Sequence, residues 1–379
     1  MTEAVIVDGI RTPIARAGKD KSYYENIRGD ELGALCVREL LRRNSKVNPA
    51  EIEDVIWGCA NQSAEQSLNI GRMIALLAEL PVEVAGTTVD RQCGSSLQAL
   101  NFAAQAIMTG AGDIAIAGGV EHMTHIPMGS GLAPNNRLLE MFPRDMFFMG
   151  LTAERLAAMH HITRQQADAF SLRSNQRAVA ARSRFAEEIV KVPIGEGKLA
   201  ETDQGPRADT SLEKLAALAP SFKPDGQVTA GNSSQISDGA AAVLVMSAER
   251  ARALGVRPMV RIRATAVAGV RPEIMGWGPV PATAKALGRA GLKMNDIDLF
   301  EINEAFAAQV LACNTEMKIN EDKLNVNGGA VALGHPLGCS GARLMTTLIH
   351  EMRRRGARLG VATMCIGMGQ GVATVVEQI

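Results

Sequence analysis

The chain has 379 residues, and its 40 Lys and Arg residues balance 40 Asp and Glu residues, so its formal net charge is zero. This balance supplies no broad positive field of the kind that nucleic-acid binding needs, so we expect no nucleic-acid partner. The six cysteines are too few for a disulfide scaffold and contain no Cys-x-x-Cys pair, which predicts reduced thiols and no metal site.

Short apolar runs and helical periodicities alternate along the first 119 residues. Glycines and turn-forming residues separate them, Gly9 and Gly58 among them. In chain order we predict a buried strand at 5–7, a helix at 30–43, a strand at 55–57, a helix at 94–109 and a strand at 114–117.

The last third of the chain repeats this order, with Asp113 matched to Arg358 at a period of about 245 residues. The predicted elements are a helix at 284–290, a strand at 299–302, a helix at 341–353, and strands at 359–364 and 372–376. Alternation of strands and helices predicts mostly parallel sheets that are covered by helices. We therefore predict a duplicated α/β core, with chance similarity between two halves as the alternative.

The middle of the chain differs in character. Residues 121–150 are rich in Met, Pro and Gly, and residues 194–231 are mostly polar. We interpret this part as an insertion with its own helices within 152–185, placed to cover a site. The expected organisation is an N-terminal core half (1–119), an inserted loop domain (120–245) whose end returns to the N-terminal half, and a C-terminal core half (246–379).

No membrane or secretory segment is predicted. The first residues lead into a strand without the basic and apolar regions of a signal peptide. No apolar run approaches the roughly 18 residues that a membrane helix needs. We expect a cytoplasmic protein without a membrane span.

Cys93 lies at the predicted entry to the helix at 94–109, beside the small residues Gly94 and Ser95. A thiol at this place experiences the positive end of the helix dipole and unpaired backbone N–H groups. Both favour the thiolate, which is the nucleophilic form of cysteine. The alternative is a buried, inert cysteine.

Three further side chains stand at strand ends or helix starts. His335 lies in the glycine-bounded turn 334–338 and could accept a proton, or it could be a purely structural histidine. Cys365 opens a glycine turn that includes Gly367, whose bare N–H groups could stabilise an oxyanion. Asn303 could hold a water molecule or an oxyanion, and it could also cap a helix. Together these residues predict one shared site.

Four segments resemble the signatures of the thiolase family, in the family's order. They are Cys-Gly-Ser-Ser at 93–96, Asn-Glu-Ala-Phe at 303–306, Gly-His-Pro-Leu-Gly at 334–338 and Cys-Ile-Gly-Met-Gly at 365–369. The resemblance spans essentially the whole chain. It implies the duplicated thiolase fold of the α/β class: two similar mixed-sheet halves with helices in αβαβα layers, plus an inserted loop domain.

The resemblance also implies a role for each residue of the site. Cys93 is similar to the acyl-accepting nucleophile, and His335 to the base that activates it. With a water held by Asn303, His335 would form one oxyanion hole. Cys365 is similar to the acid/base that moves a proton on the carbon of acetyl-CoA. The backbone N–H groups of Cys93 and Gly367 would form a second oxyanion hole.

By the same resemblance, coenzyme A (CoA) is a co-substrate that lies under the insertion, and no cofactor is bound permanently. Arg207 would face its phosphates and Ser234 its pantetheine arm. Lys214 replaces a small polar residue of the family, which puts that contact in doubt. The matching contact positions are Met149, Arg207, Phe222, Ala230 and Ser234.

Phe148-Met149 stands where short-chain biosynthetic thiolases carry His-Met. This departure, with segments 334–342 and 362–371, most resembles the β subunit of the bacterial fatty-acid oxidation complex. The expected activity is that of a 3-ketoacyl-CoA thiolase (acetyl-CoA C-acyltransferase) in fatty-acid β-oxidation. The alternatives are a biosynthetic acetoacetyl-CoA thiolase, a ketoacyl synthase and a non-catalytic assembly or lipid-binding protein. The resemblance implies a homodimer and allows a hydratase/dehydrogenase α subunit as partner.

The remaining reactive residues have less specific settings. Cys36, Cys59 and Cys313 lie in apolar patterns and are predicted to be core residues, and Cys339 follows the His335 turn without an assigned role. For His122 and His125, we weigh the lining of a substrate tunnel against plain surface positions.

Overall fold

The protein is described by a computed structural model that covers residues 2–131 and 133–379. Its main strands are β1 (Ala4–Arg11), β3 (Asp54–Gly58), β4 (Ala85–Val89), β5 (Ile114–His122), β8 (Ser237–Ser247), β9 (Val260–Gly269), β10 (Leu299–Ile302), β11 (Leu359–Ile366) and β12 (Gln370–Gln378). Shorter strands are β2 (Ala15–Arg16), β6 (Val192–Pro193) and β7 (Leu199–Ala200). The α-helices are α1 (Gly29–Arg43), α2 (Ile70–Leu77), α3 (Ser95–Met108), α4 (Arg137–Met141), α5 (Met149–Met159), α6 (Arg164–Ala180), α7 (Leu212–Ala216), α8 (Ala248–Leu254), α9 (Pro279–Ala290), α10 (Ala307–Met317), α11 (Ala330–Leu333) and α12 (Ser340–Arg355).

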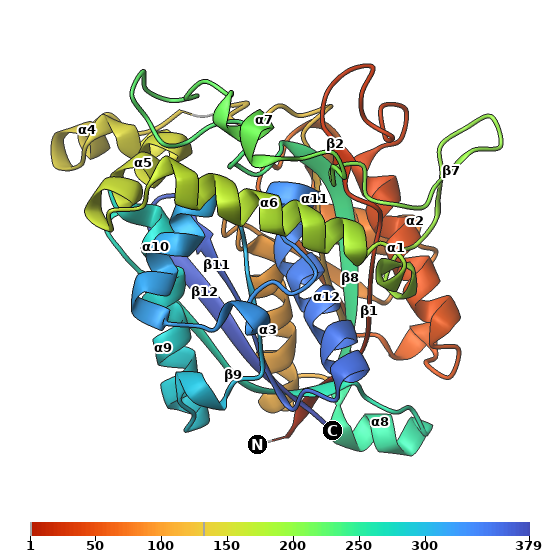
Figure 1. The fold of residues 1–379 in the computed structure, drawn as a ribbon. Coiled ribbons are helices and arrows are strands. Elements are labelled where there is room, and N and C mark those ends of the chain that lie inside the picture. The colour runs from red at the N-terminus through yellow and green to blue at the C-terminus, as the bar shows by residue number, and fades with distance from the viewer. Residues whose placement is uncertain (1, 132) are drawn as a thin grey trace.

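The elements stack in five layers (Figure 1). From left to right in that view lie α9 and α10, the strands β9–β12, the central helices α3 and α12, the strands around β1 and β8, and α1 and α2. Three apolar cores fill the spaces between these layers, and the middle one joins side chains of α3 and α12 to both groups of strands. The αβαβα layering that the resemblance implied is therefore confirmed.

The main strands form one mixed sheet in the order β10-β11-β12-β9-β1-β8-β5-β3-β4, with β2 paired to β8, and β6 and β7 form a separate small sheet. The pairs β10–β11, β3–β4 and β3–β5 are parallel, whereas the other pairs along this order are antiparallel. Our expectation of mostly parallel sheets is therefore wrong. The reason is that β11 turns directly back into β12, and that β8 returns from the insertion between β1 and β5.

Equivalent contacts in the two halves support the duplication. The Glu53 carboxylate accepts a hydrogen bond from the backbone N–H of Asp113 at the start of β5, with an O···N distance of 3.2 Å. The Asp298 carboxylate accepts one from the N–H of Arg358, just before β11, at 2.9 Å. Each carboxylate thus fixes the strand that follows a central helix, at the predicted spacing of the repeat.

Two predicted strands are longer than expected because they run through glycines. β1 continues past Gly9 to Arg11, and β5 continues past Gly118 and Gly119 to His122. A Cβ at Gly118 would lie 2.3 Å from the Trp57 ring, and one at Gly119 would lie 2.0 Å from a backbone oxygen. These glycines therefore permit close packing of the layers and do not end the strands.

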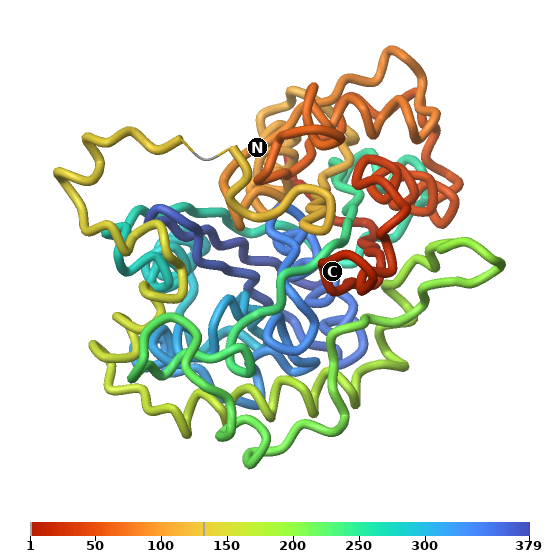
Figure 2. The backbone as a smooth tube through the Cα atoms, turned by 90° about the horizontal axis from the view of Figure 1, so that it is seen from above, coloured from red at the N-terminus to blue at the C-terminus, as the bar shows by residue number. Residues whose placement is uncertain are grey.

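The insertion lies across one end of the layered core. α5 and α6 lie across the ends of α10, α11 and α12 in Figure 1, with α7 on the far side of α6, and the segment after β5 makes the wide excursion seen from above in Figure 2. β8 then returns the chain to the N-terminal strands, where it pairs with both β1 and β5. This arrangement leaves the carboxyl ends of β10 and β11 beneath the insertion.

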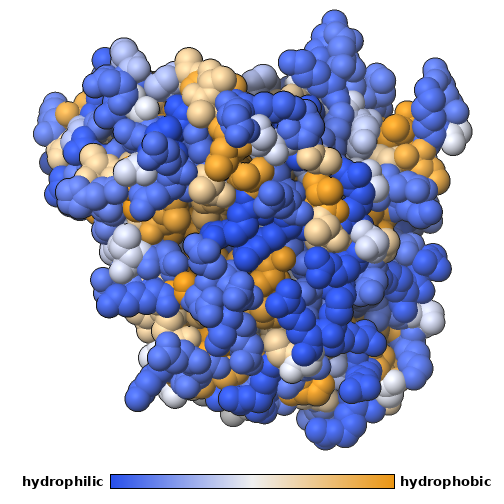
Figure 3. Space-filling view, viewed as in Figure 1, coloured by the Kyte–Doolittle hydropathy of each residue, from blue (hydrophilic) through white to orange (hydrophobic). Residues whose placement is uncertain are grey.

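The described residues include no helix that is both long enough and apolar enough to cross a membrane. The face in Figure 3 is mostly hydrophilic, with small apolar patches scattered over it.

Glu377 joins β12 to its neighbours through three arginines. Its carboxylate accepts from Arg261 at 2.7 Å and from Arg358 at 2.9 Å, and it also contacts Arg263. Burial alone would raise the pKa of Glu377, but hydrogen bonds from Arg261 and Arg263 lower it to about 2. The carboxylate therefore stabilises the fold above the ordinary Glu pKa of about 4.3, and this contribution disappears as the pH falls toward 2.

We expect Glu377→Gln to lower the free energy of unfolding at pH 7 on the order of 2 kcal/mol, because three guanidinium groups lose their shared anion. Chemical denaturation between pH 2 and pH 7 measures this difference, which should shrink as the pH falls. Glu3→Gln, which removes a half-exposed partner of Arg261, is the matched control and should cost less. A pH-independent difference between wild type and Glu377→Gln would contradict the assignment.

Candidate active site

Cys93 lies on a tight turn between β4 and α3. Gln92 takes a left-handed conformation with φ of 46°, and the Ser95 hydroxyl donates to its carbonyl at 2.6 Å. A Cβ at Gly94 would lie 2.6 Å from the Ile366 side chain, so only glycine lets the turn pack against the end of β11. The turn therefore brings Cys93 toward the β11–β12 turn.

Cys93 is the one cysteine of the six that retains exposed surface, and all six are free thiols. Burial of its sulfur raises the pKa of Cys93 to about 11, while backbone hydrogen bonds at Gly367 and at Cys93 itself lower it. The structure thus directs at the sulfur the two backbone groups that the sequence predicts as an oxyanion hole. Helix α3 begins at Ser95, so Cys93 lies at the helix entry as predicted; the backbone N–H groups lower the pKa of Cys93 as expected, but burial raises it more.

Cys365 lies near the end of β11, close enough to Cys93 for the Cys93 thiol to influence the ionisation of Cys365. Burial raises the pKa of Cys365 well above its usual range, and the neighbouring Cys93 raises it further. Cys365 packs in an apolar cluster with Phe306 and Met149. A Cβ at Gly367 would lie 3.9 Å from the Met149 sulfur. The β11–β12 turn, Cys365 and Met149 therefore share one space beside Cys93.

Asn303 and His335 form a hydrogen-bonded pair at the end of β10. The backbone N–H of Asn303 donates to the Thr363 carbonyl of β11 at 3.0 Å. Asn303 and Cys365 therefore stand at the carboxyl ends of adjacent parallel strands. The Asn303 side-chain nitrogen lies 3.2 Å from His335 Nε2. Helix α10 has Phe306 at its N-cap, so the alternative of Asn303 as a helix cap is wrong.

Ser340 determines which nitrogen of His335 carries the proton. The Ser340 hydroxyl donates to the Pro336 carbonyl at 2.8 Å, so its oxygen is left to accept from His335 Nδ1, 2.5 Å away. Nδ1 therefore carries the proton, and Nε2 accepts from the Asn303 amide. Burial, aided by the charge of Arg343, lowers the pKa of His335 to about 3. His335 is thus a neutral imidazole whose unprotonated Nε2 can act as a base.

The carbonyl oxygen of the Asn303 side chain is buried and has no hydrogen-bond partner among the described residues. A buried polar atom without a partner costs free energy, and a bound water or a substrate hydrogen-bond donor removes that cost. Asn303 is therefore suited to hold such a molecule next to His335.

Five positions were predicted to contact CoA, and they divide into two groups. Met149 lies beside Cys365, and Phe222 packs edge-to-face on Phe306 with ring centres 6.1 Å apart. Arg207 and Ala230 line an open groove of about 160 Å³. The groove also contains Lys214, the departure from the family pattern, which pairs with Asp209 at 2.6 Å.

Ser234 connects these two groups. Its backbone N–H donates to the Ala305 carbonyl at 3.0 Å, in the same segment as Asn303. The next residue, Gln235, lines the groove and accepts from the His335 N–H at 3.1 Å. The predicted contacts therefore follow a continuous path from the Arg207 groove to His335.

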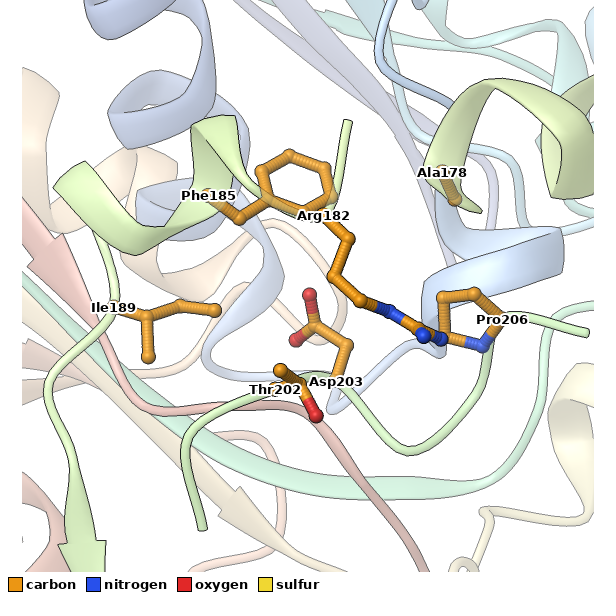
Figure 4. A pocket seen from close by; sticks show the side chains of 7 residues that line it. All are labelled: Ala178, Arg182, Phe185, Ile189, Thr202, Asp203 and Pro206. Atoms are coloured by element: carbon orange, nitrogen blue, oxygen red, sulfur yellow. The ribbon is translucent and has the colours of Figure 1, made fainter. Parts of the chain in front are cut away.

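A second, smaller cavity lies away from these residues (Figure 4). Its volume is only about 10 Å³, and none of the predicted site residues lines it. The Asp203 carboxylate that enters it is already bound by Arg11 at 2.7 and 2.9 Å. The lining residues are Ala178, Arg182, Phe185, Ile189, Thr202, Asp203 and Pro206.

Glu65, His122 and His125 gather in a third place, but their polar atoms are already engaged. His122 Nε2 donates to the Tyr24 carbonyl at 3.1 Å, and its Nδ1 accepts from the N–H of His125 at 3.3 Å. His125 contacts Glu65 at 3.0 Å and the Glu25 carbonyl at 2.8 Å. His122 is fully buried, so neither of its expected settings, tunnel lining or surface, is correct. These contacts connect loops, and they leave these three side chains without a set of free atoms to bind a metal ion.

The sequence did not point to Ser340 or Glu121 as residues that position the site. Glu121 is fully buried and accepts from the backbone N–H of Gly338 at 2.8 Å, and from those of Ala60 and Asn61 at 3.0 Å. It therefore anchors the turn that carries His335. A serine five residues after a histidine, at a helix start, is a signal that could have identified Ser340. Cys36, Cys59 and Cys313 are buried, as predicted.

We expect Ser340→Ala to lower the rate of any reaction that uses His335 Nε2 as base by about tenfold to a hundredfold, because Nδ1 loses its acceptor. The kcat of the variant, measured as a function of pH, tests this. Ser340→Thr keeps the hydroxyl and should restore most of the rate. An unchanged kcat in Ser340→Ala, or an equal loss in Ser340→Thr, would show that the hydroxyl does not set the tautomer.

Comparisons with known proteins agree with this geometry. The chain matches "Thiolase, N-terminal domain" over residues 4–249 and "Thiolase, C-terminal domain" over residues 256–378. It therefore belongs to the thiolase family, and it is an acyltransferase with the thiolase fold, as the resemblance implied. It is similar to a 3-ketoacyl-CoA thiolase of Shewanella loihica, with 54% identity covering 100% of both chains.

Two further relatives support the same placement. A 3-ketoacyl-CoA thiolase of Marinobacter nauticus is 52% identical, over 100% of this chain and 98% of that protein. The crystal structure of the Bacillus anthracis acetyl-CoA acetyltransferase superposes with a TM-score of 0.92 at 40% identity, covering 100% of this chain and 99% of that one.

Proposed function

We propose that the protein is a 3-ketoacyl-CoA thiolase that cleaves 3-ketoacyl-CoA with CoA, giving acetyl-CoA and a shortened acyl-CoA in fatty-acid β-oxidation. The observation that carries this proposal is the meeting of two thiols, Cys93 and Cys365, at the Gly367 turn. Full-length relatives at 52% and 54% identity carry the name of this activity. No metal or bound cofactor is needed, because backbone dipoles can hold the charge that develops.

The first step forms the acyl-enzyme. The sulfur of Cys93 attacks the 3-keto carbon while its proton passes to Nε2 of His335. The bond between C2 and C3 then breaks, and acetyl-CoA leaves as an enolate, which the Cys365 thiol protonates at C2. Because the pKa of Cys93 is about 11 and that of His335 about 3, the proton stays on sulfur until the substrate oxygen accepts negative charge.

The second step releases the shortened acyl group. The thiol of a second CoA gives its proton to the Cys365 thiolate and attacks the thioester carbon on Cys93. The N–H groups of Cys93 and Gly367 hold the oxyanion of the tetrahedral intermediate. Collapse returns the shortened acyl-CoA and the Cys93 sulfur, which recovers its proton from His335. Cys365 thus ends each cycle as a thiol.

A biosynthetic acetoacetyl-CoA thiolase is the second candidate, because the Bacillus anthracis structure is an acetyl-CoA acetyltransferase. Thiolysis rates with acetoacetyl-CoA and with 3-ketoacyl-CoAs of medium and long chains separate the two. We expect kcat/KM to rise with chain length. A clear preference for acetoacetyl-CoA would favour the biosynthetic activity, and no cleavage of any of them would overturn both.

We also propose that the protein works as a homodimer in the cytoplasm. In the described part of the chain, β4 is one of the two edge strands of the large sheet and pairs only with β3. An edge strand presents unpaired backbone groups that a second copy can pair with. Leu68 and Val82, in the flanking loops, are 83% and 69% exposed, which supports an apolar contact there. Sizing of the protein alone tests the homodimer. Sizing of a mixture with a hydratase/dehydrogenase α subunit tests whether the two also form a complex.

A further inference from the structure

Arg16 reaches the wall of the groove that contains Arg207. Its backbone N–H donates to the Gln204 side chain at 3.0 Å, and its guanidinium Nη2 donates to the Gly205 carbonyl at 3.4 Å. The side chain of Gln235, a lining residue of the groove, donates to the same carbonyl at 3.4 Å. The Arg16 guanidinium therefore lies beside a polar group that faces the groove.

Arg16 and Arg207 are two neighbouring cations without a shared anion. Burial lowers the pKa of Arg16, and the charge of Arg207 lowers it further. The Nε atom of Arg16 is buried and has no hydrogen-bond partner among the residues described. Across 2–131 and 133–379, neither guanidinium has a carboxylate within the 4.0 Å of an ion pair. Asp209 is near enough for the charge of Arg207 to help lower the pKa of Asp209, but no carboxylate of the described residues forms an ion pair with either guanidinium to offset the repulsion between them.

The two carboxylates nearest in sequence to Arg207 are already paired with other cations. Asp203 is bound by Arg11, and Asp209 is bound by Lys214 at 2.6 Å. Neither side chain can neutralise the pair without breaking its own contact. An anion that enters the groove would therefore be the natural counter-ion. Phosphate is well suited, because the planar guanidinium can donate two parallel hydrogen bonds to it.

We propose that Arg16 is a second phosphate-binding residue for CoA, and that with Arg207 it holds one phosphate of the nucleotide end at the mouth of the groove. This rests on the proposed function, in which CoA is both acceptor and carrier. From a phosphate held there, the pantetheine arm would have to extend past Gln235, whose backbone carbonyl accepts from the His335 N–H, to reach the thiols. The source is either the diphosphate or the 3′-phosphate of CoA, and the experiment distinguishes them.

The test is Arg16→Gln. We expect KM for CoA to rise about tenfold, which corresponds to about 1.4 kcal/mol, with kcat at saturation unchanged because Arg16 does not touch the thiols. Pantetheine lacks the nucleotide and all phosphates of CoA. With pantetheine as acceptor, KM should therefore be the same for wild type and Arg16→Gln. With dephospho-CoA, a lost difference identifies the 3′-phosphate, and a retained difference identifies the diphosphate.

The matched control is Arg182→Gln. Arg182 is an exposed arginine in the separate cavity next to Pro206 (Figure 4), so its removal changes the net charge nearby without touching the groove. We expect it to leave KM for CoA unchanged. Equal effects of the two variants, an unchanged KM in Arg16→Gln, or the same loss with pantetheine would overturn the role of Arg16.

The fate of the proposed function can be read separately. If wild type fails to cleave any 3-ketoacyl-CoA, the proposed function fails, and the role of Arg16 is then decided by calorimetric titration with CoA and pantetheine. There, Arg16→Gln should weaken binding of CoA about tenfold and leave binding of pantetheine unaltered. Unaltered binding of CoA would overturn the inference in this format too.

Discussion

Cys93→Ala is expected to lower kcat for thiolysis by a factor on the order of 10⁴ or more, because no other group can form the acyl-enzyme. The substitution removes a sulfur at which two backbone hydrogen bonds converge, from Gly367 and from Cys93 itself. KM should change little, because the path from the groove to His335 is untouched. Steady-state thiolysis of a medium-chain 3-ketoacyl-CoA, followed by release of acetyl-CoA, measures the loss.

Two further experiments distinguish the loss of the nucleophile from a folding defect. Cys36→Ala, at a fully buried cysteine away from the site, should retain most of the activity. Mass spectrometry after treatment with iodoacetamide should place the label on Cys93 in wild type. Labelling should rise with pH above neutrality, because burial raises the pKa of this thiol to about 11. Substantial thiolysis by Cys93→Ala would disprove the nucleophile assignment.

Much of the core was predictable because its elements carry strong local patterns. The helix predicted at 94–109 is α3 at Ser95–Met108, and the strand predicted at 299–302 is β10. Strand ends were less predictable at Gly9 and Gly118, since a glycine is locally a breaker. Its real effect there is to admit a neighbouring layer, which is a property of the tertiary packing. The direction of strand pairing was also beyond local patterns, because it depends on where β8 returns.

The places of the candidate site residues in the fold were predictable, but their protonation states were predictable only in part. Cys93, Asn303, His335 and Cys365 each stand at a strand end or a turn, which the sequence reveals. The sequence indicated the backbone N–H groups that lower the pKa of Cys93 but not the burial that raises it more, because burial depends on the tertiary packing. Likewise, the tautomer of His335 depends on a hydroxyl and a carbonyl that meet only in the folded turn.

Cys365→Ala is expected to separate the two chemical tasks of the site. Without an acid/base at C2, the exchange of deuterium from solvent into the methyl group of acetyl-CoA should slow by about 10²- to 10⁴-fold. Thiolysis should slow to a similar extent, because the departing enolate is no longer protonated. Cys93 keeps its neighbours at Gly367 in this variant, so alkylation of Cys93 should persist.

The matched control is Cys313→Ala, at a buried cysteine close enough to influence the ionisation of Cys365. Cys313 donates to the Gly276 carbonyl at 3.1 Å and lies in the apolar core around α10, so the control tests the loss of a neighbouring thiol without removing the acid/base. It should keep normal exchange. Exchange that persists in Cys365→Ala would assign the proton transfer to His335, whose unprotonated Nε2 is the other group of the site that can accept a proton.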